Sequence, residues 1–260
     1  MRFKIATPIS HLFENQMNAI NITSHSDILE VRDRSAGHYD CACCLYHSEL
    51  NILAEWNEKE KEFLKKVKKE DNPIVASFHL ASRYQVNDIT LNECGKAFKG
   101  VGKPMSIYDM KTNVRNNCRT AKEIFGKNIV ILVENINHLL TDAYDRITDS
   151  SFIKDVVINN NIHFCLDIAH AIITCVNKKL NFSNYIKELP LNRCLQVHIS
   201  KPLKNENNIA RDSHEALSEC EWELLDYILD MTKNINYVTL EYYKDSILLV
   251  NQLKRLKELQ

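Results

Sequence analysis

Short apolar runs rich in β-branched residues recur along the chain, and a stretch that can form a helix follows each of them. Continuous apolar runs of this length are typical of parallel strands buried on both faces. Alternation of strand and helix eight times within about 250 residues is typical of a TIM barrel. The sequence therefore predicts an α/β fold, a single (β/α)8 TIM barrel in which residues 1–260 form one domain. The eight runs are 4–8, 28–32, 74–79, 105–109, 129–134, 162–167, 194–198 and 237–241.

Amphipathic segments between these runs supply the expected helices. They include residues 60–69, 120–126 and 222–232, and residues 248–260 have the periodicity of an eighth barrel helix. A doubly wound open sheet is the main alternative. That fold usually carries a glycine-rich phosphate loop after its first strand, whereas this chain has only five glycines and no such loop.

The charges are nearly balanced, with 33 basic and 34 acidic residues and a formal net charge of −1. Such a chain has no general attraction to phosphate backbones or anionic lipid, so neither nucleic acid nor a membrane is an expected partner. No apolar run approaches the length of about 18 residues that a membrane span needs, and residues 1–10 lack the apolar core of a signal peptide. We expect a soluble, cytoplasmic protein.

Nine cysteines are present, several of them inside apolar runs, where a reduced thiol in the core is expected. Residues 38–47 carry two His and three Cys, and a structural zinc site is one interpretation. The spacing of Cys41, Cys43 and Cys44 has no second Cys or His pair beside it in sequence to complete a tetrahedral site. A redox-active or core cysteine cluster on the second βα loop is favoured instead.

Polar residues stand at the ends of six successive runs. The carboxyl ends of TIM-barrel strands all face one mouth, where active sites lie. Single residues of this kind are usually helix caps or solvated loop residues, but six in a row would need six separate coincidences. Four carboxylates that meet there repel one another unless cations balance them, and imidazole plus carboxylate suits Fe(II), Mn(II) or Zn(II). The six residues are His79, Asp109, Glu134, Asp167, His198 and Glu241.

Three further residues fit the same mouth. His170 follows Asp167 by three positions, and the segment 210–217 offers Asp212 and His214, alternate residues that can converge from an extended loop. Together they form a second ligand set. The sequence thus predicts a site with more than one metal ion.

Five segments resemble the multinuclear non-haem iron-dependent oxidative enzymes, a family of the xylose isomerase-like and endonuclease IV-like TIM-barrel superfamily. They are "LVENIN", "FCLDIAHAIIT", "ELPLNRCLQVHIS", "RDSHEALSECEWELLDYIL" and "YVTLEYY", and they lie between residues 129 and 245. The ordered set Glu, Asp-x-x-His, His, Asp-x-His, Glu is common to the superfamily. The Leu-Pro-Leu…His-Ile-Ser spacing points to the oxidative family.

The resemblance implies roles for residues that match by position. Glu134, Asp167, His198 and Glu241 would be catalytic and bind a central metal, with His170, Asp212 and His214 on a neighbouring one. His79 would belong to a third site, where Tyr108–Asp109 stands in place of the second histidine common in the superfamily. It further implies two or three iron ions, with zinc or manganese as the alternative. The expected substrate is a side chain of a ribosomally made peptide, often presented by a partner protein.

Other functions on the same barrel stay open. One is a sugar isomerase or epimerase with a single Mn(II) or Zn(II), and another is a phosphodiesterase like endonuclease IV, in which metal ions generate hydroxide. The Asp212–His214 pair disfavours the first, and the balanced charge disfavours the second. A barrel that has lost activity and serves only in binding is the fourth interpretation.

Overall fold

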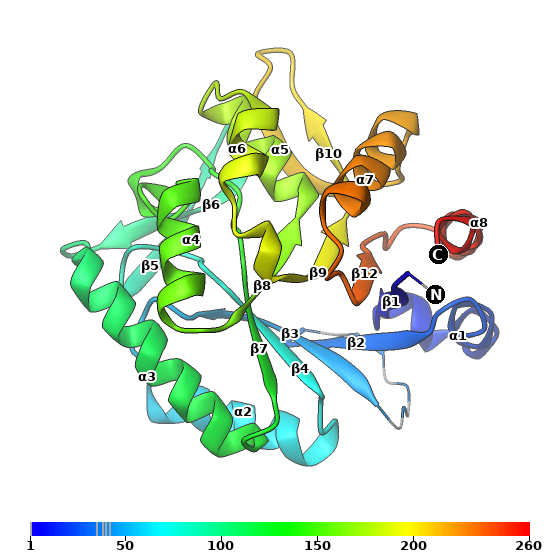
Figure 1. Ribbon diagram of the computed structural model, residues 1–260, viewed down its shortest axis with the longest axis horizontal. Helices are drawn as coiled ribbons and strands as arrows, with labels where there is room; N and C mark the ends of the chain where they lie inside the picture. The colour runs from blue at the N-terminus through cyan, green and yellow to red at the C-terminus, as the bar shows by residue number, and fades with distance from the viewer. Residues whose placement is uncertain (1, 35, 38, 40, 42) are drawn as a thin grey trace.

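Eight parallel strands close into a barrel in the computed structural model, which describes residues 2–34, 36–37, 39, 41 and 43–260 (Figure 1). The order around the barrel follows the order along the chain, and β1 pairs with both β2 and β12 to close it. The predicted TIM-barrel fold is confirmed. The barrel strands are β1 (Lys4–Pro8), β2 (Ile28–Arg32), β3 (Cys44–Asn51), β4 (Val75–His79), β7 (Val130–Glu134), β8 (His163–Asp167), β9 (Cys194–Ile199) and β12 (Tyr237–Leu240).

Helices surround the barrel on the outside (Figure 1). The predicted segments 60–69, 222–232 and 248–260 fall in α2, α7 and α8, and 120–126 is the end of a longer helix, α3. The helices are α1 (Gln16–Thr23), α2 (Glu58–Glu70), α3 (Ile107–Phe125), α4 (Ser150–Asn159), α5 (Ile168–Asn177), α6 (Phe182–Glu188), α7 (Glu219–Met231) and α8 (Ser246–Glu258). Single 3-10 turns are η1 (His11–Glu14), η2 (Asp142–Tyr144) and η3 (Leu191–Arg193).

The strand predicted over 105–109 is wrong. Ser106 and Asp109 form a reciprocal capping box, in which each side chain accepts a hydrogen bond from the other residue's backbone N–H, and α3 starts at Ile107. This pattern satisfies the free N–H groups of a helix start. The missing barrel strand is β3, Cys44–Asn51, which lies in the segment interpreted as a cysteine-bearing loop.

Two antiparallel hairpins interrupt the strand–helix alternation. Strands β5 (Val86–Asn92) and β6 (Gly95–Val101) form the first hairpin, which follows β4. Strands β10 (Lys201–Lys204) and β11 (Ala210–Glu215) form the second, which follows β9. The segment expected as an extended loop at 210–217 is therefore largely the strand β11.

Apolar and polar residues occupy different levels of the barrel interior. An apolar cluster separate from the main core contains Ala6, Ile28, Leu45, Val75, Leu132 and Cys165. Residues two apart on a strand share a face. The inward positions that follow Ile28, Leu45 and Leu132 are therefore Glu30, His47 and Glu134. The polar site thus lies directly on top of an apolar floor, at the carboxyl ends of the strands.

The main core lies between the outer faces of the strands and the helices. Tyr46, Phe78 and Phe164 are fully buried there, and each such side chain contributes about 1.5–3 kcal/mol relative to exposure. The chain ends meet, since the Arg2 N–H donates to the Gln260 carbonyl at 2.8 Å. None of the helices in the described ranges has the length and apolar character required to cross a membrane.

Candidate metal centre

Five carboxylates and five imidazoles converge at the carboxyl end of the barrel. Neighbouring pairs of them lie within 4 Å of one another, and the members contributed by the barrel strands are almost all buried. The set is Glu30, Glu134, Asp167, Asp212, Glu241, His47, His79, His170, His198 and His214.

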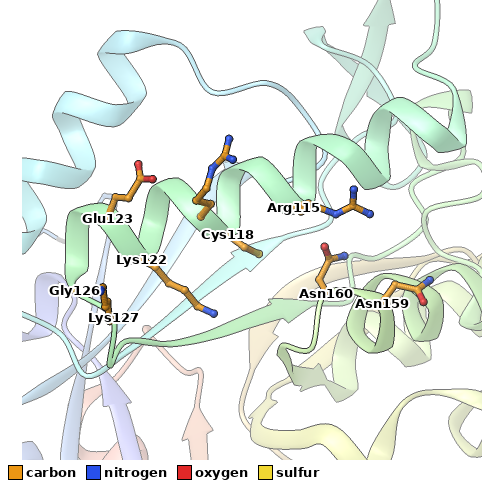
Figure 2. A pocket seen from close by; sticks show the side chains of 9 residues that line it. Arg115, Cys118, Lys122, Glu123, Gly126, Lys127, Asn159 and Asn160 are labelled. Carbon is orange, nitrogen blue, oxygen red and sulfur yellow. The ribbon is translucent and has the colours of Figure 1, made fainter.

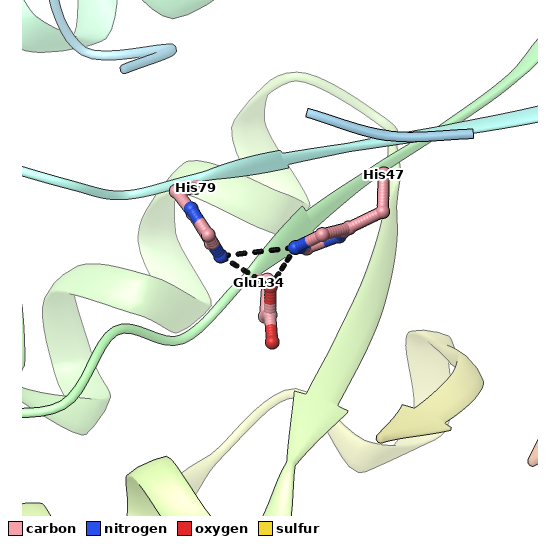
Figure 3. A group of neighbouring side chains, drawn as sticks. All are labelled: His47, His79 and Glu134. Carbon is pink, nitrogen blue, oxygen red and sulfur yellow. Dashed lines mark hydrogen bonds and ion pairs between the residues drawn. The ribbon is translucent and has the colours of Figure 1, made fainter. Parts of the chain in front are cut away.

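The first group joins strands β3, β4 and β7. Figure 3 shows His47, His79 and Glu134 pointing toward one another. The two Nε2 atoms are 3.1 Å apart, and they lie 3.2 Å and 2.8 Å from Glu134 Oε2. Imidazole nitrogens this close must share a proton or a cation. Ligands bound at about 2.0–2.2 Å from one ion stand roughly 3 Å from each other, which is the spacing seen here.

The surroundings of His47 fix its ring in the tautomer and protonation state that bind a cation. Its Nδ1 lies 2.8 Å from Ser77 Oγ, and that hydroxyl donates to the Tyr46 carbonyl. Ser77 therefore accepts a hydrogen bond from the Nδ1–H group, which leaves the Nε2 lone pair directed at Glu134. Burial lowers the pKa of His47 to about 3, so the ring is neutral, the form that binds metal.

The second group is centred on His198 of β9. Its Nε2 lies 3.1 Å from Glu30 Oε2, while Nδ1 faces Glu134 Oε1 at 3.3 Å and Glu241 Oε1 at 3.0 Å. Burial would raise the pKa of Glu30, but His198 and then Arg32 lower it to about 2. The ionised Glu30 orients the ring through Nε2, an arrangement common behind metal-binding histidines.

The third group joins α5 and β11. The His170 Nδ1–H donates to the Asn135 carbonyl at 2.8 Å, so Nε2 is left facing Asp212 Oδ2 at 3.4 Å. His214 Nε2 lies 3.5 Å from the same oxygen and 3.0 Å from Glu241 Oε2. Asp212 and His214 therefore do converge, as their alternate spacing predicted.

Glu134 is the residue that the groups share. Its Oε2 faces His47 and His79, and its Oε1 faces His198 and, at 3.6 Å, His170 Nδ1. Burial alone would raise the pKa of Glu134, but the surrounding imidazoles, His47 first, lower it well below its usual range. One carboxylate thus joins the first two donor groups, as a bridge between metal ions does, and lies beside the third.

The balance of charge and hydrogen bonds fits metal ions. Burial, followed by repulsion from Glu134, Glu241 and Asp212, raises the pKa of Asp167 to about 8, although His170 opposes this. Within the described residues Asp212 Oδ1 is buried without a hydrogen-bond partner, and Glu134 Oε2 and His198 Nδ1 have ion-pair neighbours but no well-directed hydrogen bond. Crowded carboxylates and orphaned donor atoms are both relieved by cations placed among them. The donor set of imidazole nitrogen and carboxylate oxygen suits a first-row divalent metal.

A comparison with protein families identifies the family of this chain. The model of the RiPP precursor modification enzymes MbnB/TglH/ChrH matches residues 104–259, more than half of the chain. The chain belongs to this family. One curated relative, a UPF0276 protein of Acinetobacter baylyi, is 25% identical over 127 residues, which are 48% of this chain. The match spans 43% of that relative's length.

Solved structures with the same fold include a ketose epimerase and a xylose isomerase-like barrel. D-Psicose 3-epimerase of Clostridium cellulolyticum is 14% identical, with a TM-score of 0.63 over 98% of this chain and 97% of its own. A xylose isomerase-like TIM-barrel protein of Mycobacterium smegmatis, solved with magnesium, is 10% identical, with a TM-score of 0.57 over 99% and 96%. At these identities the likeness establishes the fold of this MbnB/TglH/ChrH family member and nothing finer.

All but one of the predicted site residues of this family member meet in the cluster. Asp109 does not, because it is exposed and its carboxylate accepts hydrogen bonds from Ser106 at the start of α3. The second histidine of the third predicted site is His47, which lies beside His79, and not a residue at Tyr108–Asp109. The run "CLYHS", with a histidine at its polar end, carried the same signal as the other strands.

Glu30 and Arg32 are the other site residues that the sequence interpretation missed. The Arg32 Nε and Nη2 donate to Glu30 Oε1 at 3.0 and 2.6 Å, and Nη2 also contacts Glu241. Burial opposes the charge of Arg32, but Glu241 and Glu30 raise its pKa well above its usual value. A fixed positive charge therefore lies at the edge of the carboxylate cluster. In the sequence, the only sign of this pair is that a charged residue, Glu30, stands in the middle of the apolar run "ILEVR".

The cysteines do not form a second metal site in the described part of the chain. Six are buried, and all nine are free thiols. Cys44 lies on β3 and Cys43 is exposed, whereas His38 of the same segment lies outside the described residues. Cys165 comes near His198 and Glu134, but burial raises the pKa of its thiol well above the usual value.

Two cavities of similar size differ in what lines them. One, of about 680 Å³, opens over the cluster and is lined by His47, His79, Glu134, His170 and Glu241 together with apolar side chains. Figure 2 shows the other, also about 680 Å³, between α3 and α4 and lined by Arg115, Lys122 and Asn160 among others. The second has no set of ligand side chains, so the cavity at the barrel mouth is the candidate active site.

Proposed function

We propose that this protein is an iron-dependent oxidoreductase. It holds two or three iron ions at the barrel mouth and oxidatively modifies a side chain of a ribosomally made peptide. The observation that supports this most directly is the position of Glu134, whose carboxylate lies within 4 Å of imidazoles from all three donor groups. Membership of a family of RiPP precursor modification enzymes supports the peptide as the substrate class.

The donor clusters divide the expected ligands among three ions. Glu134, Asp167, His198 and Glu241 would hold the central ion, and His170, Asp212 and His214 its neighbour. His47 and His79, with Glu134, would hold the third. Bound iron would supply one-electron and O₂ chemistry at coordination positions that the protein leaves open.

The chain's own part is to orient ligands and exclude water. Glu30, Ser77 and the Asn135 carbonyl each accept a hydrogen bond from one ring nitrogen. The opposite nitrogens of His198, His47 and His170 therefore point inward. The apolar floor beneath the site and the buried ligands keep bulk water from it. The mouth cavity is lined by Phe98, Ile136 and Leu139 as well as by ligands, so a peptide side chain can enter beside an apolar wall.

A metal count tests this proposal directly. The protein would be purified and loaded with Fe(II) without oxygen, after which its bound iron is measured and a Mössbauer spectrum is recorded. We expect two or three irons per chain, with a spectrum changed by O₂. Binding of a single ion, together with epimerisation of a ketose, would instead establish the sugar-epimerase alternative. A peptide encoded beside the gene for this protein, incubated aerobically with it, should change in mass.

A further inference from the structure

The two hairpins that interrupt the barrel meet beside the metal centre. Asn177, the last residue of α5, holds them together. Its Nδ2 donates to the carbonyls of His138 at 2.7 Å and Ala210 at 3.0 Å, and its Oδ1 accepts the Ala210 N–H at 2.8 Å. The same Nδ2 lies 3.5 Å from Cys94 Sγ, in the turn of the β5–β6 hairpin. The turns also touch directly, through Asn207 Nδ2 and Glu93 Oε2 at 3.5 Å.

A cavity of about 300 Å³ lies where the hairpins meet. It shares Lys96, Asn137, Leu139 and Asp212 with the larger mouth cavity, so the two are neighbouring lobes of one opening. Ligand pockets usually measure about 300–1,000 Å³. This lobe therefore has room for one amino-acid residue next to whatever occupies the metal centre.

Two cations line this lobe, one from each hairpin. Lys96 comes from β6 and Arg211 from β11. No ion pair within 4 Å is found for either of them in the described ranges, although Asp212 lines the same lobe. Oδ2 of Asp212 is directed at His170 and His214 instead. The Ser213 hydroxyl, at the same wall, is buried without a hydrogen-bond partner among the described residues.

We infer that this lobe binds a carboxylate of the peptide substrate, held by Lys96 and Arg211, next to the residue that is modified. The inference rests on the proposed function, since it assumes a peptide at the metal centre. Two cations from separate hairpins can contact both oxygens of one carboxylate, and the free Ser213 hydroxyl can donate to it. The carboxylate is either the peptide's C-terminus or an Asp or Glu side chain, and these share the same chemistry.

Three tripeptides test the assignment by binding alone. Gly-Cys-Gly with a free C-terminus, Gly-Cys-Gly amide and Gly-Cys-Asp amide would be titrated calorimetrically into the iron-loaded protein without oxygen. We expect at least one of the acids to bind about 10-fold more tightly than the neutral amide, because charge-assisted hydrogen bonds are lost with the carboxylate. The acid that binds more tightly identifies the source of the carboxylate.

Substitutions then test whether Lys96 and Arg211 cause the preference for acids. In Lys96→Gln and Arg211→Gln the acids should bind within about 2-fold of the amide, while the affinity for the amide stays unchanged. Lys99→Gln and Lys204→Gln are the controls, since these exposed lysines stand on the same hairpins outside the lobe. Equal binding of acids and amide to the unsubstituted protein overturns the inference. So does a preference that survives in both variants.

The same samples separate this inference from the proposed function. Iron is counted in each before the titration. A chain that holds a single ion contradicts the multinuclear proposal, while a preference for acids that depends on Lys96 and Arg211 would still support the carboxylate site. Three bound irons without any preference for acids would support the multinuclear proposal and contradict the carboxylate site.

Discussion

The carboxylate of Asp167 uses its two oxygen atoms for different contacts. Oδ1 accepts the His170 backbone N–H at 2.7 Å, which makes Asp167 the N-cap of α5. Oδ2 faces the metal centre, 3.7 Å from His170 Nδ1. The backbone of Asp167 is fixed as well, by a pair of hydrogen bonds with the Asn135 side chain at 2.8 and 2.9 Å. Helix capping and ligand placement are therefore properties of one side chain.

The two roles of Asp167 can be separated by substitution. Asn caps helices as well as Asp, so Asp167→Asn should preserve the cap but remove the negative charge. We expect both Asp167→Asn and Asp167→Ala to lose bound metal, measured by mass spectrometry of the elements. In the metal-free state Asp167→Ala should be about 1 kcal/mol less stable to urea than Asp167→Asn. Full metal content in Asp167→Asn would contradict the ligand assignment.

His47 is expected to hold one specific ion. His47→Gln should lower the iron content by about one equivalent, because His79 and Glu134 alone offer too few ligands for that position. The remaining ions keep His198, His170, Asp212 and Glu241. His25→Gln is the matched control, since His25 follows α1 and contacts Asn21 and Ser24 rather than the cluster. An unchanged metal count in His47→Gln would remove His47 from the site.

At the scale of elements, the start of α3 was the most misleading part of the sequence. Residues 105–109 are apolar enough to be a strand, yet Ser106 and Asp109 close a capping box around the first turn of a helix. The two residues stand three apart, the spacing such a box requires. The hydrogen bonds of two backbone N–H groups at the helix start thus outweighed the apolar pattern.

Asp109 should therefore affect stability and leave metal binding alone. Asp109→Ala removes half of the capping box and should lower the free energy of unfolding by about 1 kcal/mol, measured by urea titration. The number of bound irons should equal that of the unsubstituted protein. Asn116→Ala, an exposed substitution on the same helix, controls for changes in helix propensity. Loss of metal from Asp109→Ala would restore the original prediction for this residue.

The chain as a whole shows which features a sequence can predict. Seven barrel strands are visible because their runs are apolar and largely buried, and most of them end in a polar residue. The same rule finds Glu134, Asp167, His198 and Glu241. Strand β3 was missed because Cys41, Cys43 and Cys44 favoured a cysteine cluster on a βα loop. Glu30 and Arg32 escaped because their roles depend on contacts with strands more than 160 residues away.

Removal of metal should lower the thermal stability of the whole protein. Without cations, the buried carboxylates around Glu134 repel one another, and ions that bind only the folded state stabilise it. At a free metal concentration 100 times Kd, the stabilisation is about 2.7 kcal/mol. Chelation should therefore lower Tm by roughly 5–10 °C, as measured by calorimetry, and added Fe(II) should restore it. A Tm that does not respond to chelator would mean that the cluster holds no ion.

The donor set described at the barrel mouth has a consequence for which ion the protein carries. Imidazole and carboxylate ligands without a thiolate follow the Irving–Williams order, in which Cu(II), Ni(II) and Zn(II) bind more tightly than Fe(II). Intrinsic affinity in such a site opposes the metal that the proposed chemistry requires. Iron in this barrel must then be selected by supply, through the concentrations of free ions where the chain folds. Protein produced in zinc-rich medium should consequently be well folded, fully metallated and inactive.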